Sequence, residues 1–168
     1  MNTTAKVAIG FGSIVGVIFT GDIIYTTHVK IEAWNCARSL AGTKGVINLG
    51  AGPNRAFPSQ RIALSPEVVA NVDIIPDGLP HYFRYDIENE LPFADKQFSV
   101  SYASHILEHL GNWQLALEEA CRVADFAVIV LPHPLSPWGR LSPAHKQHFS
   151  RSDIEQMGKN YNNVVVFY

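Results

Sequence analysis

The chain has 168 residues, of which 47% are hydrophobic and 17% charged, and its net charge is −2. This length and composition predict one folded domain with a sizeable core and argue against disorder. So small a net charge gives no electrostatic case for a nucleic-acid partner. The two cysteines, Cys36 and Cys121, form no C-x-x-C pair, so the sequence predicts neither a zinc knot nor a disulfide framework.

The N-terminal segment Val7–Tyr25 is apolar except for Asp22. A helix that crosses a bilayer needs about 20 mostly apolar residues, with about 17 as a minimum. Four interpretations stay open: a membrane anchor, a buried helix of the domain, a cleaved signal peptide, and a dinucleotide loop with the G-x-G-x-x-x-G motif of Gly10–Gly16. The anchor is favoured, and it would place Asp22 at the membrane interface.

We therefore expect residues 1–28 to form a hydrophobic helix and possible membrane anchor, and residues 29–168 to form the domain. Lys30, Arg38 and Lys44 follow the apolar segment. This bias in basic residues would put the domain on the cytoplasmic face of a membrane. Without an anchor, the protein is expected in the cytoplasm.

A helix and a buried strand are predicted next. Apolar residues from Val29 to Leu40 recur at helical spacing, and Gly42 is a plausible end of that helix. Val46–Leu49 is typical of a short buried strand, and it runs into a tight turn that contains Gly50 and Gly52. Because glycine lacks a Cβ and reaches positive φ freely, we expect a ligand to approach the backbone at this turn.

A second strand carries the first candidate acid. We expect Asn54–Ser65 to be a loop, Pro66–Ala70 a short helix, and Val72–Ile75 a strand that contains Asp73. Asp73 lies 23 positions after Gly50. In open α/β folds, an acid near the end of the second strand binds ribose hydroxyls of a nucleotide held over the first glycine turn. The spacing favours this role over a helix cap or a turn.

Further apolar runs complete the expected fold, with strands at 81–86, 98–103, 126–131 and 164–168 and helices at 106–120 and after residue 152. The last helix is expected to begin with the capping-box pattern of Ser152 and Glu155. Strands that alternate with helices imply an α/β fold with a parallel sheet covered on both faces. Ligands of such sheets bind beyond the carboxyl ends of the strands, where Asp73, Asp86 and Ala103–His105 fall.

Four blocks of sequence together resemble the small class I S-adenosylmethionine-dependent methyltransferases. They are I-N-L-G-A-G-P at 47–53, N-V-D-I at 71–74, Y-D-I-E-N-E-L-P-F-A-D-K-Q-F-S-V at 85–100 and S-H-I-L-E-H-L at 104–110. The resemblance covers roughly residues 45–155, and the block from 86 to 110 is its most specific part. It implies a Rossmann-like, doubly wound, mostly parallel sheet, S-adenosyl-L-methionine as cofactor, and methyl transfer as the reaction.

The resemblance also implies a cofactor site at the carboxyl ends of the strands. Its residues are Asn48, Gly50, Ala51 and Gly52 for the methionine part, Asp73 for the ribose hydroxyls, Asp86 and Ile87 for the adenine, and Ala103 and Ser104 beneath the sulfonium. The chain departs from the family pattern in several places. Asn48 stands where an acid is usual, Asn54 where a third glycine is expected, and Ser99 where another acid is frequent. The fold is expected to be minimal and to lack the last strand, which would leave a sheet edge for a partner to cover.

Methyl transfer from a sulfonium needs a base only when the acceptor is a poorly ionised hydroxyl or amine. Histidine suits that role, because its unperturbed pKa is about 6.5. His105 is the first candidate for the base, and His109, His133, His145 and His148 follow on the same side of the predicted sheet.

The segment after the fifth predicted strand commonly shapes the acceptor site in this fold. Trp138, Arg140, His145 and His148 are its candidate acceptor contacts, and Arg140 could pair with an anionic group. The acceptor is expected to be a small molecule, a glycan or a lipid-linked intermediate. Residues 7–25 could add contact with a membrane, and the sequence indicates no particular oligomeric state.

Two other functions stay open. His105-x-x-Glu108-His109 has the H-x-x-E-H form of inverted zinc peptidases, so a zinc hydrolase is a less favoured alternative. The domain could also be a catalytically inert scaffold, because Asn48 replaces an acid and no last strand follows. The methyltransferase interpretation itself assigns no metal ligand.

Overall fold

The computed structural model describes the backbone of residues 3–52, 58–75 and 78–168, and the side chains of these ranges from residue 19 onward. The elements, in chain order, are α1 (Thr3–Leu40), β1 (Val46–Leu49), α2 (Ser59–Ala63), β2 (Val68–Asp73), β3 (Tyr82–Arg84), β4 (Phe98–Ser104), the 3-10 helix η1 (Leu107–His109), α3 (Trp113–Val123), β5 (Ala124–Val130), α4 (Pro137–Leu141), α5 (Arg151–Asn160) and β6 (Val164–Phe167).

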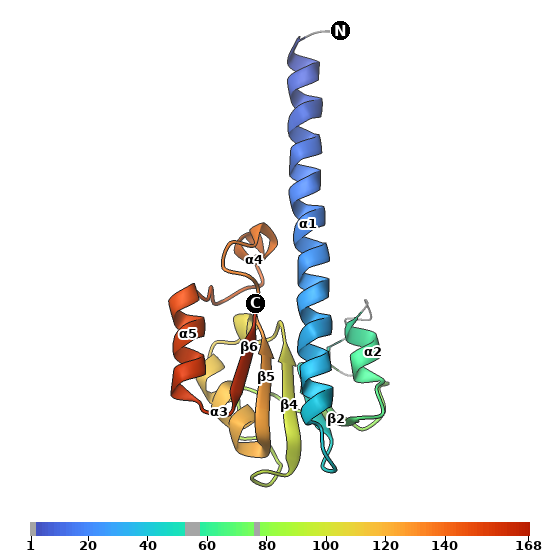
Figure 1. The fold of residues 1–168 in the computed structure, drawn as a ribbon, viewed down its shortest axis with the longest axis vertical. Coiled ribbons are helices and arrows are strands. Elements are labelled where there is room, and N and C mark those ends of the chain that lie inside the picture. The colour runs from blue at the N-terminus through green and yellow to red at the C-terminus, as the bar shows by residue number, and fades with distance from the viewer. Residues whose placement is uncertain (1–2, 53–57, 76–77) are drawn as a thin grey trace.

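The described strands form one six-stranded sheet in the order β3-β2-β1-β4-β5-β6, and every neighbouring pair runs parallel (Figure 1). The chain moves outward from β1 to β3, then returns to the other side of β1 and moves outward again to β6. This reversal makes the sheet doubly wound. The expected mostly parallel, Rossmann-like sheet is confirmed.

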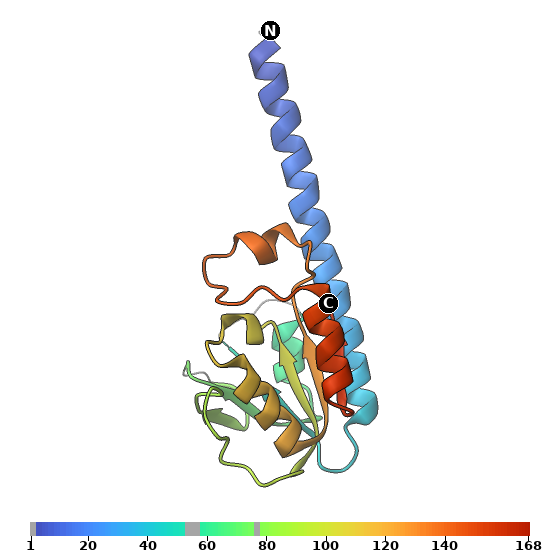
Figure 2. The ribbon, with the colours of Figure 1, turned by 90° about the vertical axis from the view of Figure 1, so that its left-hand side faces the viewer.

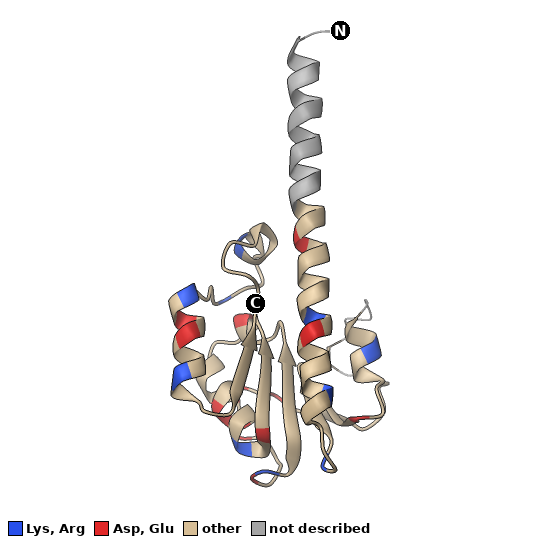
Figure 3. Cartoon of the chain, in the orientation of Figure 1, with Lys and Arg blue, Asp and Glu red and all other residues tan. Residues whose placement is uncertain are grey.

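Helices cover both faces of the sheet. In β1, Val46 joins the core under α1, whereas Ile47 joins the core under α3 and α5, because successive strand residues point to opposite faces. The residues that α1 buries recur at helical spacing: Val29, Ala33, Trp34 and Ala37. Figure 2 shows α3 and α5 on the opposite side of the sheet from α1. Charged residues lie mainly on helices and loops, as expected for strands buried on both faces (Figure 3).

The helix α1 runs without a break through the two segments that the sequence separated. The dinucleotide-loop interpretation is therefore wrong, because Gly10–Gly16 lies inside this helix. Among the residues that the structure describes, no helix has the length and apolar character that a membrane crossing needs. The side chains of residues 7–18, which carry most of the predicted anchor, lie outside the described part.

The described part of the predicted anchor contacts the domain. Asp22 Oδ2 accepts hydrogen bonds from Ser136 Oγ at 2.7 Å and from the Trp138 backbone N–H at 3.2 Å. The Tyr25 hydroxyl donates to the carbonyl of Tyr168 at 2.8 Å. The Asp22 carboxylate thus binds the start of α4, where unpaired helix N–H groups favour an anion.

The structure corrects the secondary structure expected between residues 58 and 73. The helix α2 lies inside the predicted loop, and residues 53–57 of that loop fall outside the described part. The helix predicted at Pro66–Ala70 is wrong, because Val68–Asp73 pairs with β1 as strand β2. A run of five residues is too short for its periodicity to distinguish a strand from a helix.

Two helix boundaries also differ from the prediction. Residues 106–120 do not form one helix, because Gly111 and Asn112 separate η1 from α3. The helix α5 begins earlier than expected, with Ser150 as its N-cap. Ser150 Oγ accepts from the Asp153 N–H, and Asp153 Oδ2 accepts from the Ser150 N–H. This capping box replaces the predicted pair Ser152 and Glu155.

Candidate functional site

Four strands present their carboxyl ends along one edge of the sheet. Leu49 is level with Val72 on one side and with Ala103 on the other, and Asp73 is level with Arg84. Since the strands are parallel and adjacent, the segments that follow them share this edge. This edge holds the predicted positions Gly50 and Asp86, which follow β1 and β3, and Asp73 and Ser104, which are the last residues of β2 and β4.

Asp73 joins the end of β2 to the glycine turn after β1. Its Oδ2 accepts from the Gly52 N–H at 2.7 Å, and its Oδ1 accepts from the Ile75 N–H at 2.9 Å. The Gly50 and Ala51 N–H groups both donate to the carbonyl of Val72. A carboxylate has about four acceptor sites. Both oxygens of Asp73 therefore keep capacity for two ribose hydroxyls, so this residue fits the role implied for it.

Packing within the domain requires glycine at position 50. Its φ is +71°, and a Cβ placed on it would lie 2.6 Å from Cγ1 of Ile106. Any other residue would combine an unfavourable left-handed backbone with a steric clash. The side chain of Ile106 thus occupies the space that a Cβ at position 50 would need.

Asn48 lies in β1, two residues before Gly50, and is 5% exposed. Its side-chain amide donates to Oδ1 of Asn71 at 2.9 Å. Asn71 in turn donates to the carbonyls of Ala63 and Pro80, both at 3.0 Å. The amide at position 48 thus belongs to a buried polar network that links β1, β2 and the loop before β3.

The other predicted cofactor residues differ in exposure. Asp86 is exposed, and its Oδ1 accepts from the Glu88 N–H at 2.9 Å. Ile87 is buried in the core under α3, and Ala103 is buried at the end of β4. Ser104 is half-buried at the last position of β4. A ligand at this edge would meet an acid at Asp86 and an apolar wall at Ala103.

His105 is held in a strained backbone position directly after β4. Its φ is +52°, and its N–H donates to the carbonyl of Val130 at 2.9 Å. Its Nδ1 lies 3.2 Å from Oε1 of Glu108. Burial lowers the pKa of His105 below its ordinary value, although the hydrogen bond and charge of Glu108 act in the opposite direction. The imidazole is therefore neutral at pH 7 and can accept a proton.

The lowered pKa predicts a pH-dependent stability that His105→Gln removes in part. Between the folded pKa of His105 and the unfolded value of 6.5, the unfolded chain binds more protons than the folded chain. The free energy of unfolding should therefore fall as the pH drops below about 6.5. Urea unfolding between about pH 5 and pH 7.5 measures this effect. As the pH is lowered, the free energy of unfolding should fall less in His105→Gln than in the wild type.

The matched control for this series is His28→Gln on the exposed side of α1, where the His28 side chain is 70% exposed. This substitution leaves His105 in place, so the fall in the free energy of unfolding toward acid should remain. If the free energy of unfolding changes equally with pH in His105→Gln and in the wild type, the assigned direction of the His105 pKa shift is wrong.

Two cavities open beside His105 and the segment after β5. The first, of about 460 Å³, is lined by His105 together with Lys30, Trp138 and His145. The second, of about 500 Å³, is lined by Arg140, His145 and His148. The four predicted acceptor contacts therefore line one cavity or both, and His145 lines both.

Sequence reasoning missed the contribution of α1 to this site. Asp22 and Lys30 line the first cavity from that helix, and burial lowers the pKa of Lys30. Nothing near Lys30 in the sequence marks it as a site residue, because its neighbours in the cavity lie far away along the chain. Glu108, which is 1% exposed, lines both cavities and was considered only as part of a zinc-peptidase motif.

The structure does not support that zinc-peptidase motif. In an inverted zinc peptidase, the two histidines lie one turn apart on an α-helix. Here His105 precedes the short 3-10 helix η1 with a left-handed backbone, and its ring contacts Glu108.

His133 stacks on Tyr168 and accepts from the Leu135 N–H, so its role in the structure is packing.

No curated protein sequence matches the chain. Residues 47–125 match the family model described as a methyltransferase domain. The match begins in β1 and ends in β5, so it contains β1, β2 and β4 with the turn and strand ends described above. This match supports a class I, S-adenosylmethionine-dependent methyltransferase domain over residues 47–125.

Proposed function

We propose that this protein is an S-adenosylmethionine-dependent methyltransferase. The observation that carries the proposal is the hydrogen bond from the Gly52 N–H to Asp73, which joins the acid at the end of β2 to the turn after β1 within the matched domain. An acid in that position binds the ribose of a nucleotide cofactor in open α/β sheets. Bound S-adenosylmethionine would supply an electrophilic methyl group.

The chain's own residues would bind and orient the cofactor. Asp73 would accept hydrogen bonds from the ribose hydroxyls, and Asp86 would accept one from the adenine amino group. Ala103 and Ser104 would lie beneath the sulfonium, at the end of the buried strand β4. Burial of Ala103 would help to exclude water from this part of the site.

His105 would act as the base for a hydroxyl or amine acceptor. Its Nδ1 is occupied by Glu108, so its Nε2 would take the proton. A neutral imidazole is the protonation state that this step needs, and burial favours that state.

The acceptor would occupy the cavities lined by Trp138, Arg140, His145 and His148. These cavities have room for a sugar or a small metabolite. Arg140 donates through Nε to the carbonyl of Pro134, which fixes its guanidinium beside the second cavity. A glycan or a lipid-linked intermediate with an anionic group would suit this arginine.

The proposal predicts that Asp73→Ala weakens binding of S-adenosylmethionine. We expect a loss of about 1–3 kcal/mol, or about 5- to 150-fold in Kd, because two hydroxyls lose their acceptor and the glycine turn loses its tether. Calorimetric titration of the full chain measures this. Asp125→Ala is the matched control, because Asp125 pairs with Lys44 at the amino end of β5. The affinity of this variant for S-adenosylmethionine should equal that of the wild type.

Unchanged affinity in Asp73→Ala would remove Asp73 from the cofactor site. If the wild type fails to bind millimolar S-adenosylmethionine, the proposed activity is wrong and the inert scaffold becomes the better interpretation. Asp73→Asn, which keeps the size of the side chain, replaces the alanine variant if thermal melting shows that the latter does not fold.

A further inference from the structure

Three metal-binding side chains meet between the cavities described above. Glu108 and His109 come from η1, and His145 comes from the segment between α4 and α5. Each offers a ligand atom, and these three atoms lie within 4.8 Å of one another. The backbone holds the two segments together, because the Lys146 and Gln147 N–H groups both donate to the Glu108 carbonyl.

Both histidines in this cluster are oriented by backbone carbonyls. His109 Nδ1 lies 3.0 Å from the Ala144 carbonyl oxygen, and His145 Nδ1 lies 2.7 Å from the Gly139 carbonyl oxygen. A carbonyl oxygen only accepts, so Nδ1 carries the proton in each ring. The lone pair of each neutral ring is then on Nε2. Metal-bound histidines almost always donate their other N–H to a carbonyl or carboxylate in this way.

Glu108 supplies an independent sign of a missing partner. Its side chain is 1% exposed, and its Oε1 contacts His105 Nδ1 at 3.2 Å. Its Oε2 is buried without a hydrogen-bond partner among the described residues. Buried carboxylate oxygens are normally paired, because an unpaired one is costly. Glu108, His109 and His145 all line the first cavity, so a cation bound there could reach this carboxylate and both histidines.

We propose that Glu108, His109 and His145 form a binding site for a divalent transition metal ion of the zinc class. Two imidazoles and a carboxylate are ligands that such ions favour. Three protein ligands leave a coordination position open, as in catalytic rather than structural zinc sites. This ligand set differs from the H-x-x-E-H motif, because His105 binds Glu108 instead of the metal.

The open position would face the cavity that His105 also lines. An acceptor hydroxyl bound to the ion there would be more acidic and would lie near the candidate base. This second step rests on the proposed methyltransferase function, whereas the metal site itself does not.

Titration of the full-length, untagged protein with cobalt and zinc tests the site. After treatment with a chelator, the wild type should bind one equivalent of zinc by calorimetry, and cobalt should give the visible absorption of a nitrogen- and oxygen-ligated ion. His145→Gln should weaken binding by about 100-fold or more, since loss of even a residue that supports a ligand costs 10- to 100-fold. Glu108→Gln should weaken it comparably, but it could also impair folding, so His145→Gln is the primary variant.

His148→Gln is the matched control. Its ring lies 6.3 Å from that of His145, centroid to centroid, and it is exposed and outside the cluster. Unchanged zinc affinity in this variant supports the site, whereas equal losses in both histidine variants would overturn it. Failure of the wild type to bind zinc or cobalt would also overturn it.

The same preparation separates this proposal from the proposed function. Zinc binding by a protein that does not bind S-adenosylmethionine would uphold the metal site and contradict the methyltransferase activity. Cofactor binding without zinc or cobalt binding would overturn the metal site alone.

Discussion

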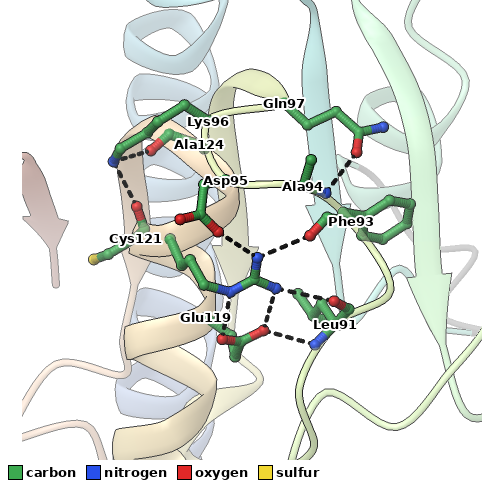
Figure 4. A network of polar contacts seen from close by, with 10 residues as sticks. Leu91, Phe93, Ala94, Asp95, Lys96, Gln97, Glu119, Cys121 and Ala124 are labelled. Carbon is green, nitrogen blue, oxygen red and sulfur yellow. Dashed lines mark hydrogen bonds and ion pairs between the residues drawn. The ribbon is translucent and has the colours of Figure 1, made fainter.

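Replacing Glu119 with glutamine should lower the free energy of unfolding by about 2–4 kcal/mol. The Glu119 carboxylate is buried on α3, and Figure 4 shows it beside the Leu91 backbone within a network of polar contacts. Oε1 accepts from Arg122 Nε at 2.7 Å, and Oε2 accepts from Arg122 Nη2 at 2.7 Å and from the Leu91 N–H at 2.6 Å. A glutamine would turn an NH₂ group toward one of these donors and remove the charge that pairs the guanidinium. Urea unfolding measures the loss.

Glu118→Gln is the control for this prediction, because Glu118 is the preceding residue of α3 and is exposed. Its effect should stay within about 0.5 kcal/mol. The hydrogen bond from Arg122 holds the pKa of Glu119 below its ordinary value of 4.5. Its stabilisation is therefore present above about pH 4.5 and is lost as the pH falls through the lowered pKa. The difference in the free energy of unfolding between the wild type and Glu119→Gln should decrease in acid. A difference that stays constant with pH would contradict the role of the charge.

This network connects the stability of the domain with its candidate site. Arg122 also donates to the carbonyls of Leu91 and Phe93 and to Asp95 Oδ1, so one guanidinium fixes most of the turn before β4. That turn follows directly after Asp86 and Ile87 in the chain. The L-P-F turn, which made this block resemble the methyltransferases, is thus held by polar contacts from α3 in addition to its own hydrogen bond from the Phe93 N–H to the Leu91 carbonyl.

Most of the strands could be located from the sequence because they are short apolar runs next to a turn or a helix. The strand β5 and the end of β1 were found in this way, and parallel pairing followed from the alternation of strands with helices. The segment Ile106–Leu110 was not predicted correctly. Its apolar residues have helical spacing, but they pack as a single 3-10 turn after the left-handed His105, and Ile106 fills the space beside Gly50. That packing depends on a contact between distant parts of the chain.

In the candidate site, too, some residues could be placed from local sequence, whereas others depend on contacts between distant parts of the chain. Asp73 and the glycine turn could be placed from local sequence, because the ends of parallel strands necessarily meet at one edge. The contacts of Asp22 with Ser136 and of His109 with the segment before His145 join residues that are far apart in the chain. No local pattern predicts which distant segment folds onto a strand end. The three residues of the proposed metal site were therefore brought together only by the three-dimensional structure.

Asn48 shows how a departure from the family pattern can be a structural requirement. We expect Asn48→Asp to lower the free energy of unfolding by about 3 kcal/mol near pH 7. Asn71 donates its amide to the carbonyls of Ala63 and Pro80, so its own oxygen must point toward position 48. A carboxylate there would place a buried negative charge against that oxygen, with no hydrogen to share between them. Thermal and urea unfolding of the variant measure the loss.

The pH dependence of this loss tests its cause. Burial next to an acceptor should raise the pKa of the new carboxyl above its unfolded value, so the penalty is present above the raised pKa and disappears as the pH falls below it. A protonated carboxyl can donate to Asn71 Oδ1 as the native amide does. Asn112→Asp is the control, because Asn112 is the exposed N-cap of α3, where aspartate is as favourable as asparagine. If Asn48→Asp is as stable as the wild type near pH 7, Asn71 must reorient, and position 48 can then carry the acid that is usual in the family.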